Sequence, residues 1–143
     1  MRSDDEDAEL APQPGLDRVD ALIGEVSRAG LPVHLHVEGE PYALPRGIDI
    51  SAYRIVQEGL TNALKHANAH HADVALHYAP DQVRIEVRDD GDGASPTRAN
   101  GAGYGLVGIR ERVKLYGGEM SVGRAREGGF VLTTRLPVGG YTR

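Results

Sequence analysis

The feature that most constrains the fold is a pair of neighbouring segments in which apolar residues occupy every second position. These apolar positions are Val74, Leu76 and Tyr78, followed by Val83, Ile85 and Val87. A period of two predicts two strands, each with one face on a core. Only residues 79–82 separate them, which requires a hairpin, because parallel strands need a crossover of a dozen or more residues. An all-parallel, doubly wound sheet is therefore excluded.

The other periodic segments complete the order helix, strand, helix, two strands, loop, helix, two strands. Apolar residues recur at helical spacing over residues 16–26, 52–67 and 106–116. Residues 33–38 alternate like a strand, and residues 119–124 and 130–136 like a second hairpin. We expect Asp49 to cap the second helix, which runs to about Ala67, and Gly117-Gly118 to end the third. This order predicts an α+β fold, a two-layer α/β sandwich whose mostly antiparallel sheet carries the helices on one face.

Length and composition indicate one ordinary globular domain. The chain has 143 residues, a formal net charge of −5 and no Cys. We expect an acidic tail or linker at residues 1–15, the domain at 16–138 and a short tail at 139–143. The acidic balance argues against a general binder of nucleic acid or acidic membranes. The lack of Cys excludes disulfides, metal–thiolate sites and thiol nucleophiles, and no apolar run approaches the length of a membrane span.

The second predicted helix carries a polar stripe beside its apolar one. Glu58, Asn62 and Lys65 fall at positions i, i+4 and i+7, which share one face of a helix. A carboxylate, a carboxamide and an ammonium suit a hydrated Mg²⁺ with phosphates, because Mg²⁺ takes one or two protein oxygens and keeps its other ligands. A solvated face with a Glu–Lys pair is the alternative, although Asn is a poor helix former and its mid-helix place needs a reason.

A second polar motif, Asp89-Asp90-Gly91-Asp92-Gly93, comes directly after a predicted strand. Alternate glycines allow backbone to approach a flat ligand, and an Asp accepts a hydrogen bond from an exocyclic amine such as adenine N6. An ordinary Asp-Gly turn is one alternative. A calcium loop is another, but the terminal Glu of an EF-hand is missing.

A third motif places glycines immediately before and within the start of the last predicted helix. Its members are Gly101, Gly103, Gly105 and Gly108. Backbone N–H groups and the positive end of a helix dipole bind phosphates at such a place. No βαβ unit surrounds the motif and no Gly-Lys-Ser/Thr follows it, so it fits neither the Rossmann nor the Walker signature.

In this order, the three motifs resemble the catalytic, ATP-binding domain of two-component sensor histidine kinases, within the ATPase superfamily of gyrase B, Hsp90 and MutL. Glu58-x-x-x-Asn62-x-x-Lys65-His66 is similar to the N box, Asp89-x-Gly91-x-Gly93 to the G1 box, and Gly103-x-Gly105-Leu106 to the G2 box. Residues 53–67 and 105–113 are close to the subgroup of nitrate sensors and the membrane-thickness thermosensor. The resemblance covers about residues 16–138 and implies a Bergerat-type ATP-binding fold.

The resemblance also implies a role for each matching residue. Asn62 would coordinate Mg²⁺, and Glu58 would hold a water in that shell or polarise the nucleophile, so that these two form the catalytic pair. Asp89 would bind adenine N6, and residues 94–102 would form the ATP lid. The implied nucleotide-binding residues are Asn62, Lys65, His66, Asp89, Gly91, Gly93, Gly103, Tyr104, Gly105, Leu106 and Thr133.

Two features depart from the family pattern. Many relatives have Thr after the Gly that opens the last strand, whereas Phe130 follows Gly129 here and Thr133 is the candidate substitute. In this subgroup an acidic residue follows the target histidine, and none of the six histidines here precedes Asp or Glu.

The resemblance therefore implies a cytoplasmic domain that binds ATP with Mg²⁺, releases ADP and phosphorylates a histidine elsewhere. That histidine would lie on the dimerisation and phosphoacceptor domain of the same sensor kinase, which passes the phosphoryl group to a response regulator. The domain itself would contact neither nucleic acid nor the membrane, although its parent kinase can be membrane-bound.

Three alternatives remain open. One is a non-kinase nucleotide-binding regulatory module whose ATP lid controls a protein partner. Another is a Ser/Thr kinase of the anti-sigma type, which residues 105–113 match less well. The third is a zinc site at His66, His70 and His71, near a helix end and without Cys.

Overall fold

The computed structural model describes residues 13–66, 68–91, 104–125 and 128–138, except for the side chains of His66 and Tyr104. The helices in this part are η1 (Leu16–Arg18), α2 (Val19–Arg28), α3 (Arg46–His66) and α5 (Tyr104–Leu115). The strands are β1 (Val33–Glu38), β2 (Ala72–Ala79), β3 (Gln82–Asp89), β4 (Glu119–Arg124) and β5 (Phe130–Pro137). The predicted order of elements is confirmed.

The strands form one five-stranded sheet in the order β1-β2-β3-β5-β4. β1 pairs with β2 in parallel, and the three other neighbouring pairs are antiparallel. The hairpin that the alternation predicts is present as β2 and β3, with Ala72 opposite Asp89 at its open end. The mostly antiparallel sheet is thus confirmed.

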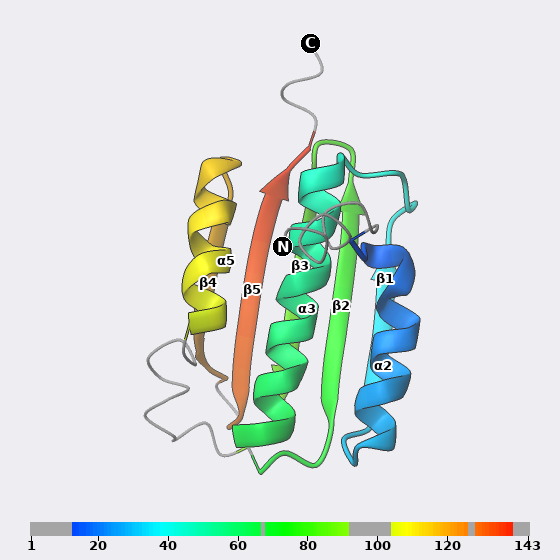
Figure 1. Ribbon diagram of the computed structural model, residues 1–143, viewed down its shortest axis with the longest axis vertical. Helices are drawn as coiled ribbons and strands as arrows, with labels where there is room; N and C mark the ends of the chain where they lie inside the picture. The colour runs from blue at the N-terminus through cyan, green and yellow to red at the C-terminus, as the bar shows by residue number, and fades with distance from the viewer. Residues whose placement is uncertain (1–12, 67, 92–103, 126–127, 139–143) are drawn as a thin grey trace, which may run out of the picture.

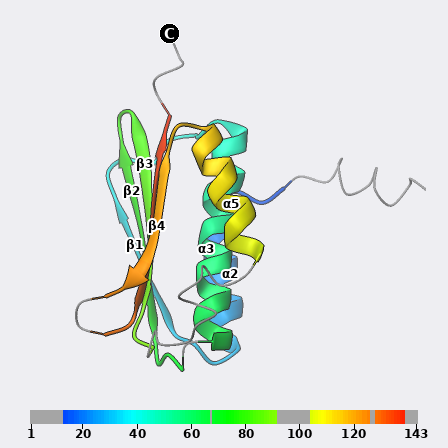
Figure 2. The same cartoon turned by 90° about the vertical axis from the view of Figure 1, so that its left-hand side faces the viewer.

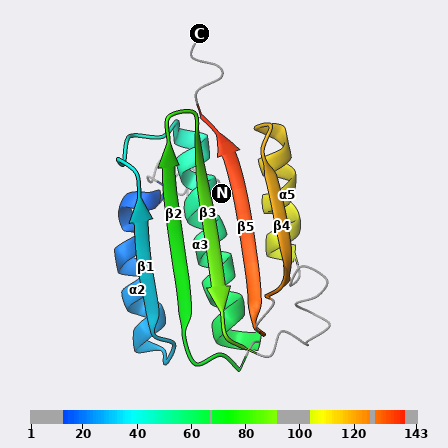
Figure 3. The same cartoon turned by 180° about the vertical axis from the view of Figure 1, so that it is seen from behind.

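Helices cover one face of this sheet (Figure 1). Seen from the side, α2, α3 and α5 form one layer and the strands the other (Figure 2). From behind, the strands of the described part carry no helix in front of them (Figure 3). The α+β sandwich with helices on one face is therefore the observed fold.

The core lies between the two layers. Val83, Ile85 and Val87 of β3 are at most 3% exposed and belong to one cluster with Ile55 and Leu60 of α3, which are 0% exposed. The residues between them on β3 are more exposed, so the period of two separates a helix-facing side from an open side. Burying each such side chain contributes about 1.5–3 kcal/mol.

The start of α3 differs from the predicted one. The helix begins at Arg46, and the N–H of Asp49 already donates to the carbonyl of Pro45 at 2.8 Å. The Asp49 carboxylate is therefore not the cap; its Oδ1 accepts a hydrogen bond from the N–H of Leu16 at 2.9 Å. Asp49 instead ties the start of η1 to α3, a contact that is distant in sequence and thus invisible to local rules.

The ends of two other elements can be compared with the predicted ones. α5 ends as predicted, because Gly117 and Gly118 N–H groups donate to the carbonyls of Lys114 and Val113 at 2.9 Å each. β5 runs to Pro137, one residue farther than predicted.

The helix layer lies close against the sheet at Gly59 of α3. A Cβ atom there would lie 2.9 Å from Cγ1 and 3.0 Å from Cβ of Val87 on β3. No larger side chain fits at this distance, so glycine lets the helix backbone rest directly on the strand. Asn62 follows Gly59 by three residues and Asp89 follows Val87 by two. The contact therefore sets how the polar ends of α3 and β3 lie relative to each other.

We expect Gly59→Ala to destabilise the fold although alanine favours helices. Overpacking costs about 1–3 kcal/mol, against a helix-propensity gain of about 1 kcal/mol, so the net loss should reach up to about 2 kcal/mol in urea unfolding. Gly24→Ala is the matched control on α2, since its Cβ would meet only Arg28 Nη1 at 3.4 Å. That variant should gain up to about 1 kcal/mol. Equal gains for both variants would contradict the close-contact explanation.

Candidate functional site

The described parts of three predicted motifs lie at one end of the molecule. The C-terminal end of α3, the end of β3 and the start of α5 all lie at the lower end in Figures 1 and 3. Contacts of α3 with both β3 and α5 hold this arrangement. The N-terminus of α5 therefore directs its positive dipole end toward the same region as the polar stripe of α3.

Asn62 is the buried member of the polar stripe on α3. Asn62 is only 4% exposed, whereas Glu58 is half-buried and Lys65 is exposed. Within the described residues, no hydrogen bond to the Asn62 carboxamide is formed. A carboxamide on the same helix face as the Glu58 carboxylate and the Lys65 ammonium is suited to a polar ligand.

Asp89 ends β3 and faces the helix layer, as do the other buried residues of that strand. The residue is 5% exposed, and its Oδ1 accepts a hydrogen bond from the N–H of Gly91 at 2.8 Å. This bond across two residues is an Asx turn, which orients the carboxylate.

A supporting glycine for Asp89 was not recognised from the sequence. Gly129 has φ +98°, and a Cβ atom there would overlap the carbonyl oxygen of Asp89. The backbone of the β4–β5 hairpin thus rests directly against the end of β3. The Gly128-Gly129 doublet signals a turn, but only the pairing of Asp89 with Phe130 reveals the contact.

The structure brings Phe130, and not Thr133, to the side of Asp89. Phe130 lies opposite Asp89 in the ladder and is 5% exposed, whereas Thr133 lies opposite Glu86. Side chains alternate along β5, so Thr133 points to the open face of the sheet. Thr133, the candidate substitute for the Thr of other family members, therefore lies on the opposite side of the sheet from Asp89.

The structure places only part of the third motif. Leu106 lies in the first turn of α5 and is 2% exposed, so it anchors the start of that helix in the core. Gly105 lies in the same turn. Gly93, Gly101, Gly103 and the predicted lid at residues 94–102 lie outside the described residues, as do the side chains of His66 and Tyr104.

The histidines of the zinc alternative have other contacts. His71 Nδ1 lies 3.1 Å from Asp90 Oδ2, and His70 Nδ1 lies 3.9 Å from the same oxygen. Among the described residues, no group of three or more His, Cys, Asp or Glu side chains is arranged to hold a metal ion. The side chain of His66 is outside that part of the chain.

Hydrogen bonds around Asp90 alter its acidity. Burial raises the pKa of Asp90, but the backbone N–H groups of His71 and His70, together with the charge and ring of His71, outweigh it. The pKa of Asp90 therefore lies below its ordinary value of 3.8. Its carboxylate is charged at neutral pH and binds the connection between α3 and β2.

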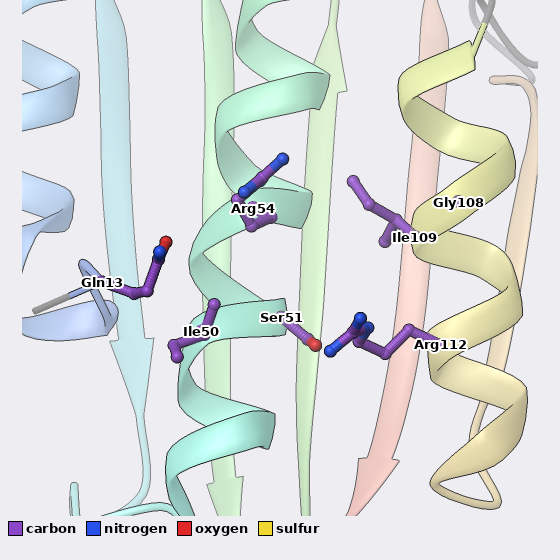
Figure 4. A pocket seen from close by; sticks show the side chains of 7 residues that line it. All are labelled: Gln13, Ile50, Ser51, Arg54, Gly108, Ile109 and Arg112. Atoms are coloured by element: carbon purple, nitrogen blue, oxygen red, sulfur yellow. The ribbon is translucent and has the colours of Figure 1, made fainter. Parts of the chain in front are cut away.

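A separate cavity of about 540 Å³ lies between α3 and α5. Ser51 and Arg112 point toward each other across it (Figure 4). Its lining residues are Gln13, Ile50, Ser51, Arg54, Gly108, Ile109 and Arg112. Of the three predicted motifs, only Gly108 lines it, and Arg54 precedes Asn62 by eight residues, or about 12 Å along the helix. This cavity is therefore distinct from the region of Asn62 and Asp89.

Comparison with known proteins identifies the family. The sequence pattern described as "Histidine kinase-, DNA gyrase B-, and HSP90-like ATPase" matches residues 47–140, a range that includes Glu58, Asn62, Asp89 and Leu106. The chain belongs to this ATPase family. The resemblance that the three motifs indicate is thereby confirmed.

Individual relatives of this ATPase domain are sensor kinases. It is 32% identical to the sensor histidine kinase YxjM of Bacillus subtilis over 126 residues, covering 87% of the chain and 30% of the relative. It is also 32% identical to the nitrate/nitrite sensor protein NarX of Escherichia coli over 133 residues, covering 91% and 22%. The chain thus spans less than a third of the length of these relatives.

Solved structures agree on the fold. The ATP-binding domain of PrrB from Mycobacterium tuberculosis superimposes with a TM-score of 0.65 at 23% identity, covering 87% of this chain and 93% of that one. The histidine kinase domain of the blue-light activated kinase from Erythrobacter litoralis gives a TM-score of 0.62 at 25% identity, covering 83% and 57%. Within the described part of this ATPase domain, no helix is long and apolar enough to cross a bilayer.

The lowered pKa of Asp90 predicts how its contribution to stability depends on pH. A carboxyl group whose pKa is lower in the folded state stabilises the fold fully above its ordinary pKa and loses that effect as pH falls through the folded pKa. Asp90→Asn should therefore reduce the free energy of unfolding by about 1 kcal/mol at pH 7 and low salt. Salt should weaken the effect, since 37% of the side chain is exposed.

The difference between Asp90→Asn and the unchanged domain should shrink between about pH 4 and pH 2, as measured by urea unfolding. Asp81→Asn, at the exposed turn of the same hairpin, is the control. A difference that stayed constant down to pH 2 would contradict the assignment.

Proposed function

We propose that this domain binds Mg-ATP and donates the γ-phosphate to a histidine on a separate phosphoacceptor domain of a sensor kinase. The observation that carries the proposal is the pairing of two buried polar side chains, Asn62 at 4% and Asp89 at 5% exposure, at the same end of packed elements. A carboxamide and a carboxylate at this end of the two layers offer oxygens to the donors and the cation of a nucleotide. Family membership and the sensor-kinase relatives support the same reading.

Asp89 is proposed to recognise adenine. Its carboxylate accepts, and the exocyclic N6 amine of adenine donates. The carboxylate is held by the N–H of Gly91, so it is oriented before the base arrives. Gly91 follows two residues after Asp89, and the absence of a side chain lets the base lie against the backbone there.

We propose that the phosphates of the nucleotide and their Mg²⁺ are bound by Asn62, Glu58 and Lys65. A carboxamide oxygen with one nearby carboxylate is a donor set that Mg²⁺ accepts, because this ion keeps most of its water and phosphate ligands. The bound Mg²⁺ would neutralise charge on the β- and γ-phosphates. Lys65 is exposed at the end of the stripe, where its ammonium can pair with a phosphate oxygen.

The start of α5 is proposed to hold the phosphate chain from the other side. The first turn of a helix carries N–H groups without partners within the helix, and its dipole attracts anions. Gly105 lies in that turn, while His66, Gly93, Gly103 and Tyr104 are proposed contacts on the basis of the family motifs.

Transfer then requires positioning more than covalent chemistry from this domain. A nitrogen of the acceptor imidazole forms a bond to the γ-phosphorus as the bond from phosphorus to the bridging oxygen breaks, and ADP leaves. Glu58, half-buried and one turn before Asn62, is placed to orient a water of the Mg²⁺ shell or to polarise the acceptor. We further propose that the reaction takes place in the cytoplasm, with a response regulator as the final acceptor.

Asn62→Asp tests nucleotide binding with a side chain of nearly equal size. A carboxylate at this buried position adds charge beside the polyphosphate, so the affinity for Mg-ADP in calorimetry should fall by at least tenfold. Gln82→Glu, at the other end of β3, changes the net charge equally and should bind normally. Failure of the folded, unchanged domain to bind ADP or ATP with Mg²⁺ would refute the proposed function.

Transfer to a histidine is tested in trans. A purified phosphoacceptor hairpin from a sensor kinase of this subgroup is mixed with the domain and γ-labelled ATP. Acid-labile label on the hairpin, abolished by Asn62→Asp, is the expected result. Tight nucleotide binding without labelling of any hairpin would favour a regulatory module whose nucleotide state controls a protein partner.

A further inference from the structure

Asp90 lies directly after Asp89, but its side chain has different neighbours. Its Oδ1 accepts hydrogen bonds from the N–H groups of His70 at 2.7 Å and His71 at 3.0 Å. Its Oδ2 lies 3.1 Å from Nδ1 of the His71 ring. In addition, the N–H of Asp90 donates to the carbonyl of His71 at 3.3 Å. Four hydrogen bonds thus join one residue to the connection between α3 and β2.

These bonds extend the hairpin ladder beyond its last pair. Ala72 is opposite Asp89 in the register, and the bond from Asp90 N–H to His71 adds the next pair of residues. The backbone of Asp90 is therefore held where a loop would otherwise begin. Gly91 follows, and its N–H is the group that orients the Asp89 carboxylate.

The contacts of Asp90 lie toward the face of the sheet that carries no described helix. His71 also approaches Asp73, with Nε2 3.5 Å from its Oδ2, and Asp73 in turn lies 3.9 Å from His36 Nε2. Asp73 occupies one of the less buried positions of β2, between the helix-facing Ala72 and Val74. Asp89 faces the helices instead, so a ligand on Asp89 and the contacts of Asp90 are on opposite sides of the chain.

We propose that Asp90 is a positioning residue for adenine recognition. It would act without touching the nucleotide, by holding the Asp89–Gly91 turn against the His70–His71 segment so that the Asp89 carboxylate is preset for the amine. The inference rests on the proposed function, since it assigns Asp89 to the base. It adds a residue from the rear face to a site otherwise built on the helix-facing side.

The test compares two ligands that differ at one group. ADP carries the exocyclic amine, whereas the diphosphate of purine riboside lacks it and cannot donate to Asp89. Asp90→Ala removes all the side-chain bonds and should weaken ADP binding about tenfold, while the affinity for the purine riboside diphosphate stays within twofold. Asp90→Asn keeps an acceptor for the two backbone N–H groups and should weaken ADP binding by about threefold, again without a change for the purine riboside diphosphate.

Two controls separate positioning from general damage. Thermal unfolding of each variant shows whether it is folded at the temperature of the titration. If Asp90→Ala is unfolded there, Asp90→Asn is titrated in its place. Asp73→Asn removes the carboxylate on the other side of the His71 ring and should leave both affinities unchanged.

Equal losses for the two ligands, or no loss for ADP, would overturn the inference. Absence of ADP binding by the unchanged domain would instead refute the proposed function itself, so the two failures are distinguishable.

Discussion

The direct contact of α3 with β3 at Gly59 and Val87 is the constraint on which the polar site depends. A Cβ atom on Gly59 would lie only 2.9 Å from Val87, so the helix backbone rests against the strand without room for a side chain. Because a helix and a strand are both stiff, this one contact fixes Asn62 near the end of β3. A ligand that needs both Asn62 and Asp89 therefore meets a preformed arrangement and does not have to order it.

Two adjacent acidic residues at the end of β3, Asp89 and Asp90, have different neighbours and different proposed roles. Asp89 turns into the helix layer at 5% exposure, and Asp90 binds His70 and His71 on the other side. The alternation of side chains along a strand makes this division possible. A carboxylate that recognises a ligand must be able to accept a hydrogen bond from that ligand. A carboxylate that holds the backbone in place can form all its hydrogen bonds within the protein. The Asp-Asp-Gly sequence thus combines recognition and support in three residues.

Local periodicity was sufficient to predict most of the fold. The two hairpins and the helix-covered face follow from alternation, helical spacing and turn residues, and the structure contains them. The start of α3 could not be predicted in this way, because Asp49 bonds Leu16, which is 33 residues away. Spacing along α3 places Glu58, Asn62 and Lys65 on one stripe, but their unequal burial depends on how α3 packs against the rest of the fold.

Other parts of the site required strand register. Thr133 and Phe130 differ by three residues, so they point to opposite faces of β5, and only the pairing of Phe130 with Asp89 decides which is near the carboxylate. The support from Gly129 and the four bonds of Asp90 join segments far apart in sequence. The cavity with Arg54 and Arg112 likewise forms between two helices, and neither helix alone predicts it.

The central claim is that nucleotide binds between the ends of α3 and β3. Titration of the ¹⁵N-labelled domain with Mg-ADP, followed by NMR, tests this position most directly. The account predicts that the largest shifts occur at the backbone of Asp89 and Gly91 and at the side-chain amide of Asn62, with little change at Ser51 and Arg112. Shifts centred on the cavity between α3 and α5, with Asp89 and Asn62 unaffected, would contradict it.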